Sequence, residues 1–406
     1  MDSAIVLILL SSLVIFSYLF DLVAKRTNLP SVLLLLGSGM IIHAISVNLG
    51  IETLDFSGIL PLLGTIGLIL IVLEGSLDLK YGKEKRGLIL KALGAAFFIL
   101  VITAICIAFF FQGYTGESFR LCLLNAIPFS VISSAVAIPS VGGLIQNKKE
   151  FLIYESSFSD ILGIVFFNFV MFNTDFSGNS FLILGRDVVV VMLFSLLICF
   201  GLVFLMGKIT HHVKFFLVIS VLMLLYGIGK YFHLSSLLIV LVLGLFLGNL
   251  NMLVNWFENK LKFKKLRKAL LYKNFDTDIT QLKVLSIESA FLIRTFFFLV
   301  FGYTMNVEVL LSSETLIVGS ATIVLILIVR VIYLQFVAKA HLWPEVLVSP
   351  RGLISVLLFV SIPREDRLFG GGNGLLLFII ISTGLLMTIG LISSKRQLPK
   401  EWGDTD

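Results

Sequence analysis

Two carboxylates lie within one apolar segment of the chain. Glu155 and Asp160 belong to a run from Phe151 to Phe172 that has no other charged residue and is long enough to cross a bilayer. Burying an ionised carboxylate in hydrocarbon is costly, so such a group is either paired with a cation or exchanges one. The segment therefore indicates an ion or proton site within a membrane.

The spacing of these residues on a helix gives the two carboxylates different neighbours. Glu155 and Ser159 are four positions apart and share one helix face, whereas Ser156 and Asp160 share the adjacent face. We expect Asp160, with Ser156 and Ser159, to line a cavity whose oxygen ligands suit a small, hard cation. Glu155 is expected to point to a neighbouring arginine, which would leave Asp160 as the carboxylate that binds ions.

Other apolar segments also carry charges, namely Glu74, Glu288, Arg294, Arg330 and Arg351. Arg330 and Arg351 are both permanent donors that could pair with Glu155 and remove most of the cost of burying it. Glu74 lies near the end of its segment and faces either a cavity that attracts cations or the solvent. Glu288 and Arg294 do not share a helix face, so we expect each to contact another span or to reach the membrane surface.

Helix breakers occur in two of the apolar segments. The fifth contains two prolines with serines between them, and the twelfth opens with Pro350 and a following Arg-Gly pair. Proline removes a backbone donor and interrupts a helix, which a membrane protein tolerates where the backbone lines a cavity. The two segments are an odd number of spans apart and run in opposite directions, as inverted repeats require. The crossing residues that we single out are Ser133, Ser134, Pro139 and Arg351.

Composition indicates a membrane protein. Hydrophobic residues make up 58% of the 406 residues, charged residues make up 14%, and the mean hydropathy is +1.05. This leaves too little polar surface to cover a soluble protein. The basic residues behind the net charge of +6 lie in short loops, which is typical of membrane topology and not of nucleic-acid binding. The three cysteines show no metal-ligand spacing, and we find no nucleotide-binding motif, so we expect a transporter without a cofactor and not an enzyme.

Hydropathy predicts an all-α, polytopic membrane protein of about 13 transmembrane helices. The first apolar run has no basic region before it, so we expect it to be retained as a span and not cleaved as a signal peptide. The expected spans are residues 4–24, 31–48, 58–79, 88–112, 119–146, 151–173, 185–207, 215–232, 234–250, 285–305, 314–338, 346–362 and 371–393.

Basic residues gather in alternate loops. The positive-inside rule then places the N-terminus outside and the C-terminus in the cytoplasm of a plasma or inner membrane. The longest basic loop carries a cluster of lysines and an arginine at 260–273, interleaved with apolar side chains. This cluster reads either as an amphipathic helix on anionic lipid or as a linker between two halves of the protein.

These motifs resemble the monovalent cation:proton antiporter family, most closely its sodium/proton exchanger branch. The family's Glu-Ser-x-x-Asn-Asp motif of the sixth span reads here Glu155-Ser156-Ser157-Phe158-Ser159-Asp160. Four weaker motifs follow the family's order along nearly the whole chain: Lys-Arg-x-x-Leu-Pro at 25–30, Glu-Gly-x-Leu-x-Leu at 74–79, the arginine at 330, and Pro-Arg-Gly at 350–352.

The resemblance implies an architecture and a role for each carboxylate. A core domain, mainly 88–173 and 285–393, would hold two broken helices that cross at the midplane. A dimerisation domain, mainly 1–79 and 185–250, would form a homodimer, and the basic linker would comprise 251–284. Asp160 would alternately bind a proton and a monovalent cation, Na⁺ or else K⁺ or Li⁺.

The resemblance further implies that Glu155 pairs with Arg330, while Arg351 adds charge near the crossing. With one free carboxylate, the simplest exchange is one cation for one proton and is electroneutral. A proton and a cation compete for a carboxylate that can bind only one of them at a time. Binding of one ion therefore requires release of the other, which is exchange.

Two departures from the family pattern keep other functions open. Ser159 stands where the branch has asparagine, and residues 137–139 read Ala-Ile-Pro where the branch often has Thr-Asp-Pro. One alternative is a transporter-derived membrane module that acts as an ion channel, sensor or partner-binding subunit. Another is a carrier of organic anions or of solutes coupled to sodium.

Overall fold

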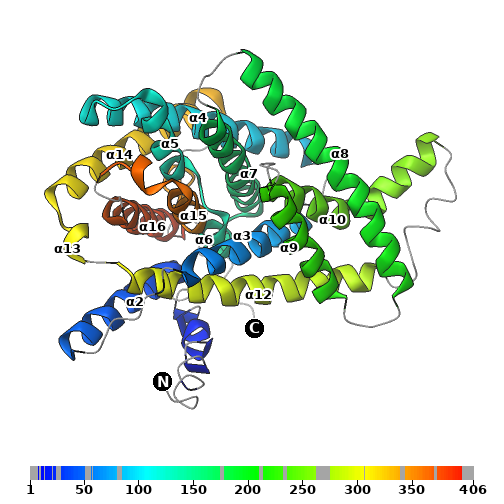
Figure 1. The fold of residues 1–406 in the computed structure, drawn as a ribbon, viewed down its shortest axis with the longest axis horizontal. Helices are drawn as coiled ribbons and strands as arrows, with labels where there is room; N and C mark the ends of the chain where they lie inside the picture. The colour runs from blue at the N-terminus through cyan, green and yellow to red at the C-terminus, as the bar shows by residue number, and fades with distance from the viewer. Residues whose placement is uncertain are drawn as a thin grey trace. The chain divides into compact units, whose positions relative to one another are not determined.

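The described part of the chain folds as α-helices (Figure 1). The computed structural model describes residues 29–50, 56, 58–79, 85–173, 178–209, 214–231, 236–261, 275–305, 307–338, 343–369 and 373–395, with some residues between 8 and 23. Across these ranges the regular structure is helical and contains no strand, which confirms the all-α prediction. Part of the expected first span, the basic residues of the 25–30 motif and most of the cluster at 260–273 lie outside the described residues.

Ten helices of the described chain are long and apolar enough to cross a membrane, which confirms an integral membrane protein. Two further apolar helices are shorter, α9 (Phe215–Tyr231) and α15 (Leu353–Ser361), so the count of about 13 stays a prediction. The ten spans are α2 (Ser31–Asn48), α3 (Ile59–Asp78), α4 (Arg86–Thr115), α5 (Phe119–Ser130) continued by α6 (Ser134–Ser140), α7 (Gln146–Phe172), α8 (Gly178–Lys208), α10 (Ser236–Leu261), α12 (Phe275–Tyr303), α14 (Ser313–Ile332) and α16 (Asn373–Lys395).

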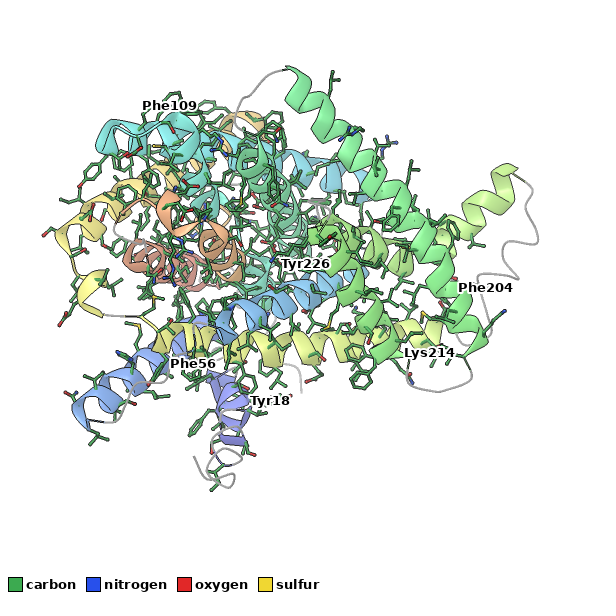
Figure 2. All side chains as sticks on the ribbon, in the orientation of Figure 1. Tyr18, Phe56, Phe109, Phe204, Lys214 and Tyr226 are labelled. Atoms are coloured by element: carbon green, nitrogen blue, oxygen red, sulfur yellow. The ribbon has the colours of Figure 1, made fainter. Side chains whose placement is uncertain are left out.

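Large apolar side chains are exposed along these helices. Phe109 of α4 is 60% exposed and Phe204 of α8 is 53% exposed, and both point away from the helices that carry them (Figure 2). A soluble monomer rarely exposes so much apolar surface, whereas a membrane protein presents it to lipid tails. The exposed faces therefore agree with the spans found by hydropathy.

Serine side chains cap two of the helices at their first turn. The hydroxyl of Ser118 accepts the N–H of Leu121 at the start of α5, and that of Ser312 accepts the N–H of Thr315 at the start of α14. Each cap satisfies one of the backbone donors that a helix start leaves unpaired. These caps help to explain why both helices begin close to the apolar runs from which the sequence predicted them.

Two compact units make up the described chain. Unit 1 comprises Met1–Thr65, Gly87–Gly163 and Leu292–Asp406, and unit 2 comprises Ile66–Arg86 and Ile164–Phe291. Both broken helices and the two carboxylates of α7 belong to unit 1. The division into a core domain and a dimerisation domain is a statement about motion and assembly, and it stays a prediction.

Within unit 1, glycines let α2 and the C-terminal part of α12 approach closely. A Cβ atom added to Gly39 would lie 2.7 Å from the backbone nitrogen of Tyr303, and one added to Gly302 would collide with the backbone of Leu36. Small residues at such crossings allow two membrane helices to pack backbone against backbone. Elsewhere in this unit α14 packs on α16, and α15 lies beside α5.

Unit 2 is built around α10, which packs on α8 and α9. Gly244 and Gly248 of α10 face Ser76 and Leu77 of α3 so closely that added Cβ atoms would collide. Asn249 donates from Nδ2 to the carbonyl of Leu79 at 2.9 Å, which satisfies a backbone acceptor just after α3 ends.

Candidate functional site

Two broken segments cross within unit 1: the interrupted helix formed by α5 and α6, and residues 343–361, in which turns and a non-helical stretch precede α15; we refer to both as broken helices. The chain is extended at Val131 and Ser133, between α5 and α6, and it is non-helical before α15 begins at Leu353. The backbone N–H of Ser133 donates to the carbonyl of Pro350 at 2.9 Å, which joins the two interruptions directly. A Cβ atom on Gly352 would lie 2.6 Å from Cγ2 of Val136, so glycine permits this crossing.

The prolines do not lie in the interruption of the first broken helix. Pro128 is inside α5 and Pro139 is inside α6, whereas the break falls between them at residues 131–133. A proline removes one N–H and weakens the helix around it, but the point of the break is set by the partners that the freed backbone groups find. Those partners come from α7 and from the second broken helix.

Arg351 satisfies the carbonyl groups at the end of α5. Its Nε donates to the carbonyl of Phe129 at 2.7 Å, its Nη2 donates to that of Ser130 at 3.3 Å, and its Nη1 binds the carbonyl of Ser349. The backbone N–H of Arg351 donates to Oγ1 of Thr383 at 3.1 Å. The C-terminus of a helix carries unpaired carbonyls and a partial negative charge, so a buried guanidinium stabilises it.

Glu155 forms a bidentate ion pair with Arg330. Nη1 and Nη2 of the arginine lie 2.7 and 2.8 Å from the two carboxylate oxygens, with side chains 0% and 1% exposed for Arg330 and Glu155. Arg330 also donates to the carbonyls of Glu345 at 2.8 Å and Val348 at 3.3 Å. The sequence left both Arg330 and Arg351 as possible partners of Glu155. In the structure Arg330 pairs with Glu155, and Arg351 binds the carbonyls at the end of α5. Both charges are compensated, as deep burial requires.

A second ion pair lies beside the first. Nζ of Lys148 is 3.3 Å from a carboxylate oxygen of Glu345 and donates to the carbonyl of Trp343 at 2.7 Å. Sequence reasoning treated Lys148 as a loop charge and did not single out Glu345. The sequence feature that could have indicated this pair is Glu345 itself, a single carboxylate shortly before the non-helical stretch that precedes α15. Because Arg330 donates to the backbone of Glu345, the two pairs share one residue.

Asp160 belongs to α7, and its side chain binds the backbone at the start of α6. Its Oδ2 accepts the backbone N–H of Ser134 at 3.1 Å, and its side chain is 3% exposed. Its other oxygen, Oδ1, is buried and has no hydrogen-bond partner within the described part of the chain. A buried carboxylate oxygen without a donor is costly, so Oδ1 is a position that a proton or a cation would stabilise.

The two serines predicted beside Asp160 are both engaged with backbone groups. Oγ of Ser159 accepts the N–H of Ile132 at 2.9 Å, which satisfies a donor in the break between α5 and α6. Oγ of Ser156 donates to the carbonyl of Ile153 at 3.2 Å in its own helix. Ser159 therefore holds the broken backbone, and Ser156 keeps its lone pairs available as a ligand.

Five hydroxyls are buried without a partner among the described residues, and two of them, those of Ser133 and Ser157, belong to the segments next to Asp160. Ser157 precedes Asp160 by three positions and so shares its side of α7, a spacing that sequence reasoning overlooked. In the chain as described, no three His, Cys, Asp or Glu side chains gather to hold a metal ion. A cation at Asp160 would thus be held by one carboxylate together with hydroxyl and backbone oxygens.

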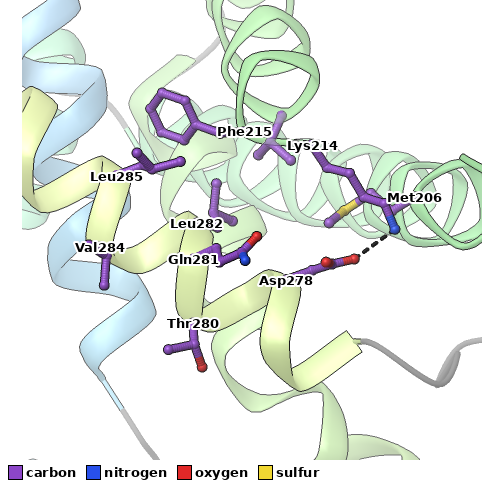
Figure 3. A pocket seen from close by; sticks show the side chains of 10 residues that line it. Met206, Lys214, Phe215, Asp278, Thr280, Gln281, Leu282, Val284 and Leu285 are labelled. Atoms are coloured by element: carbon purple, nitrogen blue, oxygen red, sulfur yellow. Dashed lines mark hydrogen bonds and ion pairs between the residues drawn. The ribbon is translucent and has the colours of Figure 1, made fainter. Parts of the chain in front are cut away.

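Glu74 and a cavity of about 400 Å³ both belong to unit 2. Glu74 is half-buried near the end of α3, and its role as an accessory site residue stays a prediction. The cavity is lined mainly by apolar side chains of α9 and α12, and it contains an ion pair in which Nζ of Lys214 is 2.7 Å from Oδ2 of Asp278 (Figure 3). None of the predicted site residues lines it, so we assign it no part in ion binding.

Comparison with known proteins agrees with this geometry. The sequence model of the family described as "Sodium/hydrogen exchanger, transmembrane" matches residues 9–395. A structure of the sodium proton antiporter MjNhaP1 from Methanocaldococcus jannaschii at pH 8 is similar in fold, with a TM-score of 0.67 and 20% identity over 98% of this chain and 100% of that one. A second structure of MjNhaP1, from an electron-microscopy map, has a TM-score of 0.66 and 18% sequence identity to this chain, over 100% of both chains. None of the curated proteins matches.

The family match extends over nearly all of the chain, and it includes both broken helices, the Glu155 pair and Asp160. The apolar spans place these residues in a membrane. This protein is therefore an integral membrane protein of the sodium/hydrogen exchanger family.

Proposed function

We propose that this protein exchanges a monovalent cation, sodium in the first place, for protons across its membrane. The observation that carries the proposal is the carboxylate of Asp160, of which one oxygen is bound by Ser134 and the other has no partner in the described chain. Such an oxygen is stabilised by either a proton or a cation, and the two exclude each other. Membership of the exchanger family supports the same reaction.

The exchange is one cation for one proton. Glu155 is neutralised by the bidentate contact with Arg330, so Asp160 is the carboxylate left to change its partner. A cycle that carries one positive charge in each direction moves no net charge and is insensitive to membrane voltage. It requires no cofactor beyond the transported ions.

Hydroxyl oxygens complete the proposed cation site. The hydroxyls of Ser133, Ser156 and Ser157 supply the kind of neutral, hard ligand that Na⁺ and Li⁺ prefer. Ser159 is engaged with Ile132 and acts on the site through the backbone. The order of preference among Na⁺, Li⁺ and K⁺ follows from the space that these oxygens leave.

Transport further requires that Asp160 faces each side of the membrane in turn. The parts at 88–173 and 285–393 move as a core against 1–79 and 185–250 of a homodimer, and Glu74 attracts cations to the cytoplasmic side. The N-terminus lies outside, the C-terminus lies in the cytoplasm of a plasma or inner membrane, and the basic segment at 260–273 binds anionic lipid. The buried charges of unit 1 support the transport step, because charges inside a membrane are costly and typically functional, and the distribution of basic residues among the loops supports the orientation and the lipid contact.

Purified protein in liposomes tests the exchange directly. With a pH-sensitive dye inside, addition of Na⁺, Li⁺ or K⁺ should move protons at a rate that saturates with cation concentration. Asp160→Asn should abolish the response while leaving thermal unfolding close to that of the wild type. Glu314→Gln, which changes an exposed carboxylate at the start of α14, is the matched control and should exchange normally.

Retained exchange in Asp160→Asn would move the ion site elsewhere. Cation current without any proton movement would favour the alternative of a transporter-derived module that acts as a channel, because a passive pore needs no protonatable group at its centre.

A further inference from the structure

One carbonyl of α6 cannot receive its usual helical hydrogen bond. In an α-helix the carbonyl of Ala135 would accept the N–H of the residue four positions later. That residue is Pro139, which has no N–H to donate. Ala135 is buried, so its carbonyl needs a donor from another part of the chain.

Arg294 of α12 supplies this donor. Its Nη1 lies 3.0 Å from the carbonyl oxygen of Ala135, and both residues belong to unit 1. A guanidinium is always charged and presents several N–H groups, so it can replace a missing backbone donor permanently. The carbonyl that Arg294 binds is the one that Pro139 leaves without a helical donor.

The carbonyl concerned is next to the proposed ion site. Ala135 follows Ser134, whose backbone N–H holds Oδ2 of Asp160 at 3.1 Å. Both groups belong to the first turn of α6, and that turn is short of one internal hydrogen bond. A small rotation of the turn would move the N–H of Ser134 away from the carboxylate.

We propose that Arg294 is a positioning residue for the ion site, which replaces the hydrogen bond that Pro139 removes and thereby holds the N–H of Ser134 on Asp160. The inference rests on the proposed function of Asp160. Arg351 has the equivalent task on the other half of the broken helix, where it binds the last carbonyls of α5. Each half-helix is thus completed by an arginine from a distant part of the chain.

A double-mutant cycle between Arg294 and Pro139 tests this coupling. In the wild-type background, Arg294→Met should lower the midpoint of thermal unfolding and raise the apparent KM for sodium by about threefold or more. In the Pro139→Ala background the new backbone N–H at position 139 can bind Ala135, so Arg294→Met should lose most of its effect on both quantities.

Two variants serve as controls. Pro128→Ala changes the other proline of the broken helix, which lies in α5 and not opposite Ala135, so the effect of Arg294→Met should be undiminished in that background. Arg294→Lys keeps a charged donor and should recover part of the loss in sodium affinity.

Equal effects of Arg294→Met with and without Pro139→Ala would overturn the inference. Coupling in thermal unfolding without coupling in the apparent KM would also overturn it, because Arg294 would then only stabilise the fold. If Arg294→Met alone does not fold, Pro139→Ala should restore folding, and failure to do so contradicts the proposal. The unfolding midpoint can be measured in a protein that transports nothing. If Arg294→Met and Pro139→Ala are coupled in that midpoint but no variant, nor the wild type, exchanges ions, the proposed function is refuted while the contact between Arg294 and Ala135 stands.

Discussion

The hydroxyl of Ser159 accepts the backbone N–H of Ile132 at 2.9 Å, so the residue beside Asp160 holds the break between α5 and α6. Ile132 lies in the non-helical stretch, where its N–H has no helical acceptor. Two neighbouring residues of α7 therefore accept hydrogen bonds from the backbone of the broken helix. Ser159 binds a donor before α6, and Asp160 binds the donor of Ser134 at its start. A change at Ser159 acts on the proposed ion ligand through the shared backbone.

Ser159→Ala should destabilise the protein and weaken cation binding, because it leaves the buried N–H of Ile132 without an acceptor. The expected loss in the free energy of unfolding is about 1–3 kcal/mol. Ser159→Asn introduces the family residue and retains an acceptor, so it should keep more stability while changing the order of cation preference. Thermal unfolding and a series with Na⁺, Li⁺ and K⁺ measure the two effects. A Ser159→Ala protein with wild-type stability and affinity would contradict this role.

Glu155→Ala should lower stability strongly, since it leaves the guanidinium of Arg330 buried without its counter-charge. Removing one partner of a buried pair typically costs about 3–5 kcal/mol. The double variant Glu155→Met with Arg330→Met removes both charges and should recover part of that loss. Denaturant or thermal unfolding of purified protein measures each variant. If Glu155→Ala unfolds at the wild-type midpoint, the pair does not stabilise the fold.

The helices could be predicted from the sequence because a bilayer leaves the chain few choices. Every backbone group inside the hydrocarbon must be paired, so long apolar runs become helices, and α4 or α16 follow directly from their hydropathy. The separation of Glu155 from Asp160 was also predictable from helical spacing. Both conclusions depend on residues that are near each other in the chain.

The break and its partners could not be predicted in the same way. Pro128 and Pro139 suggested an interruption, but its place at 131–133 depends on Ser159 and on Arg351, which are distant in sequence. The choice between Arg330 and Arg351 as the partner of Glu155 likewise depends on tertiary contacts. Local propensity contains no information on which distant donor reaches a given carbonyl or carboxylate.

Lys148→Met should have a smaller effect than Glu155→Ala, although both ion pairs belong to the same cluster. Lys148 is 25% exposed and Glu345 is 5% exposed, so solvent screens the pair from the lysine side, and the loss should lie between the about 1 kcal/mol of an exposed pair and the about 3–5 kcal/mol of a buried one. High salt should reduce the loss further. Unfolding midpoints at low and high ionic strength measure this difference. A loss as large as that of Glu155→Ala, and independent of salt, would show that the pair is effectively buried.

Gly352→Ala should disrupt the crossing of the two broken helices. Its Cβ atom would lie 2.6 Å from Cγ2 of Val136 and 2.8 Å from Oγ of Ser133, so the two non-helical segments would have to separate. Separation would weaken the hydrogen bond from Ser133 to Pro350 and displace the start of α6, where Asp160 is bound. We therefore expect a lower unfolding midpoint and a loss of sodium-dependent proton movement.

Gly113→Ala is the matched control for Gly352→Ala. Gly113 lies near the end of α4, and an added Cβ atom there would meet nothing within 4 Å. Because alanine favours the helix over glycine by about 0.5–1 kcal/mol, this variant should be at least as stable as the wild type and should exchange normally. If Gly352→Ala behaves like Gly113→Ala in both assays, the crossing tolerates separation and the close approach at Gly352 is not required for function.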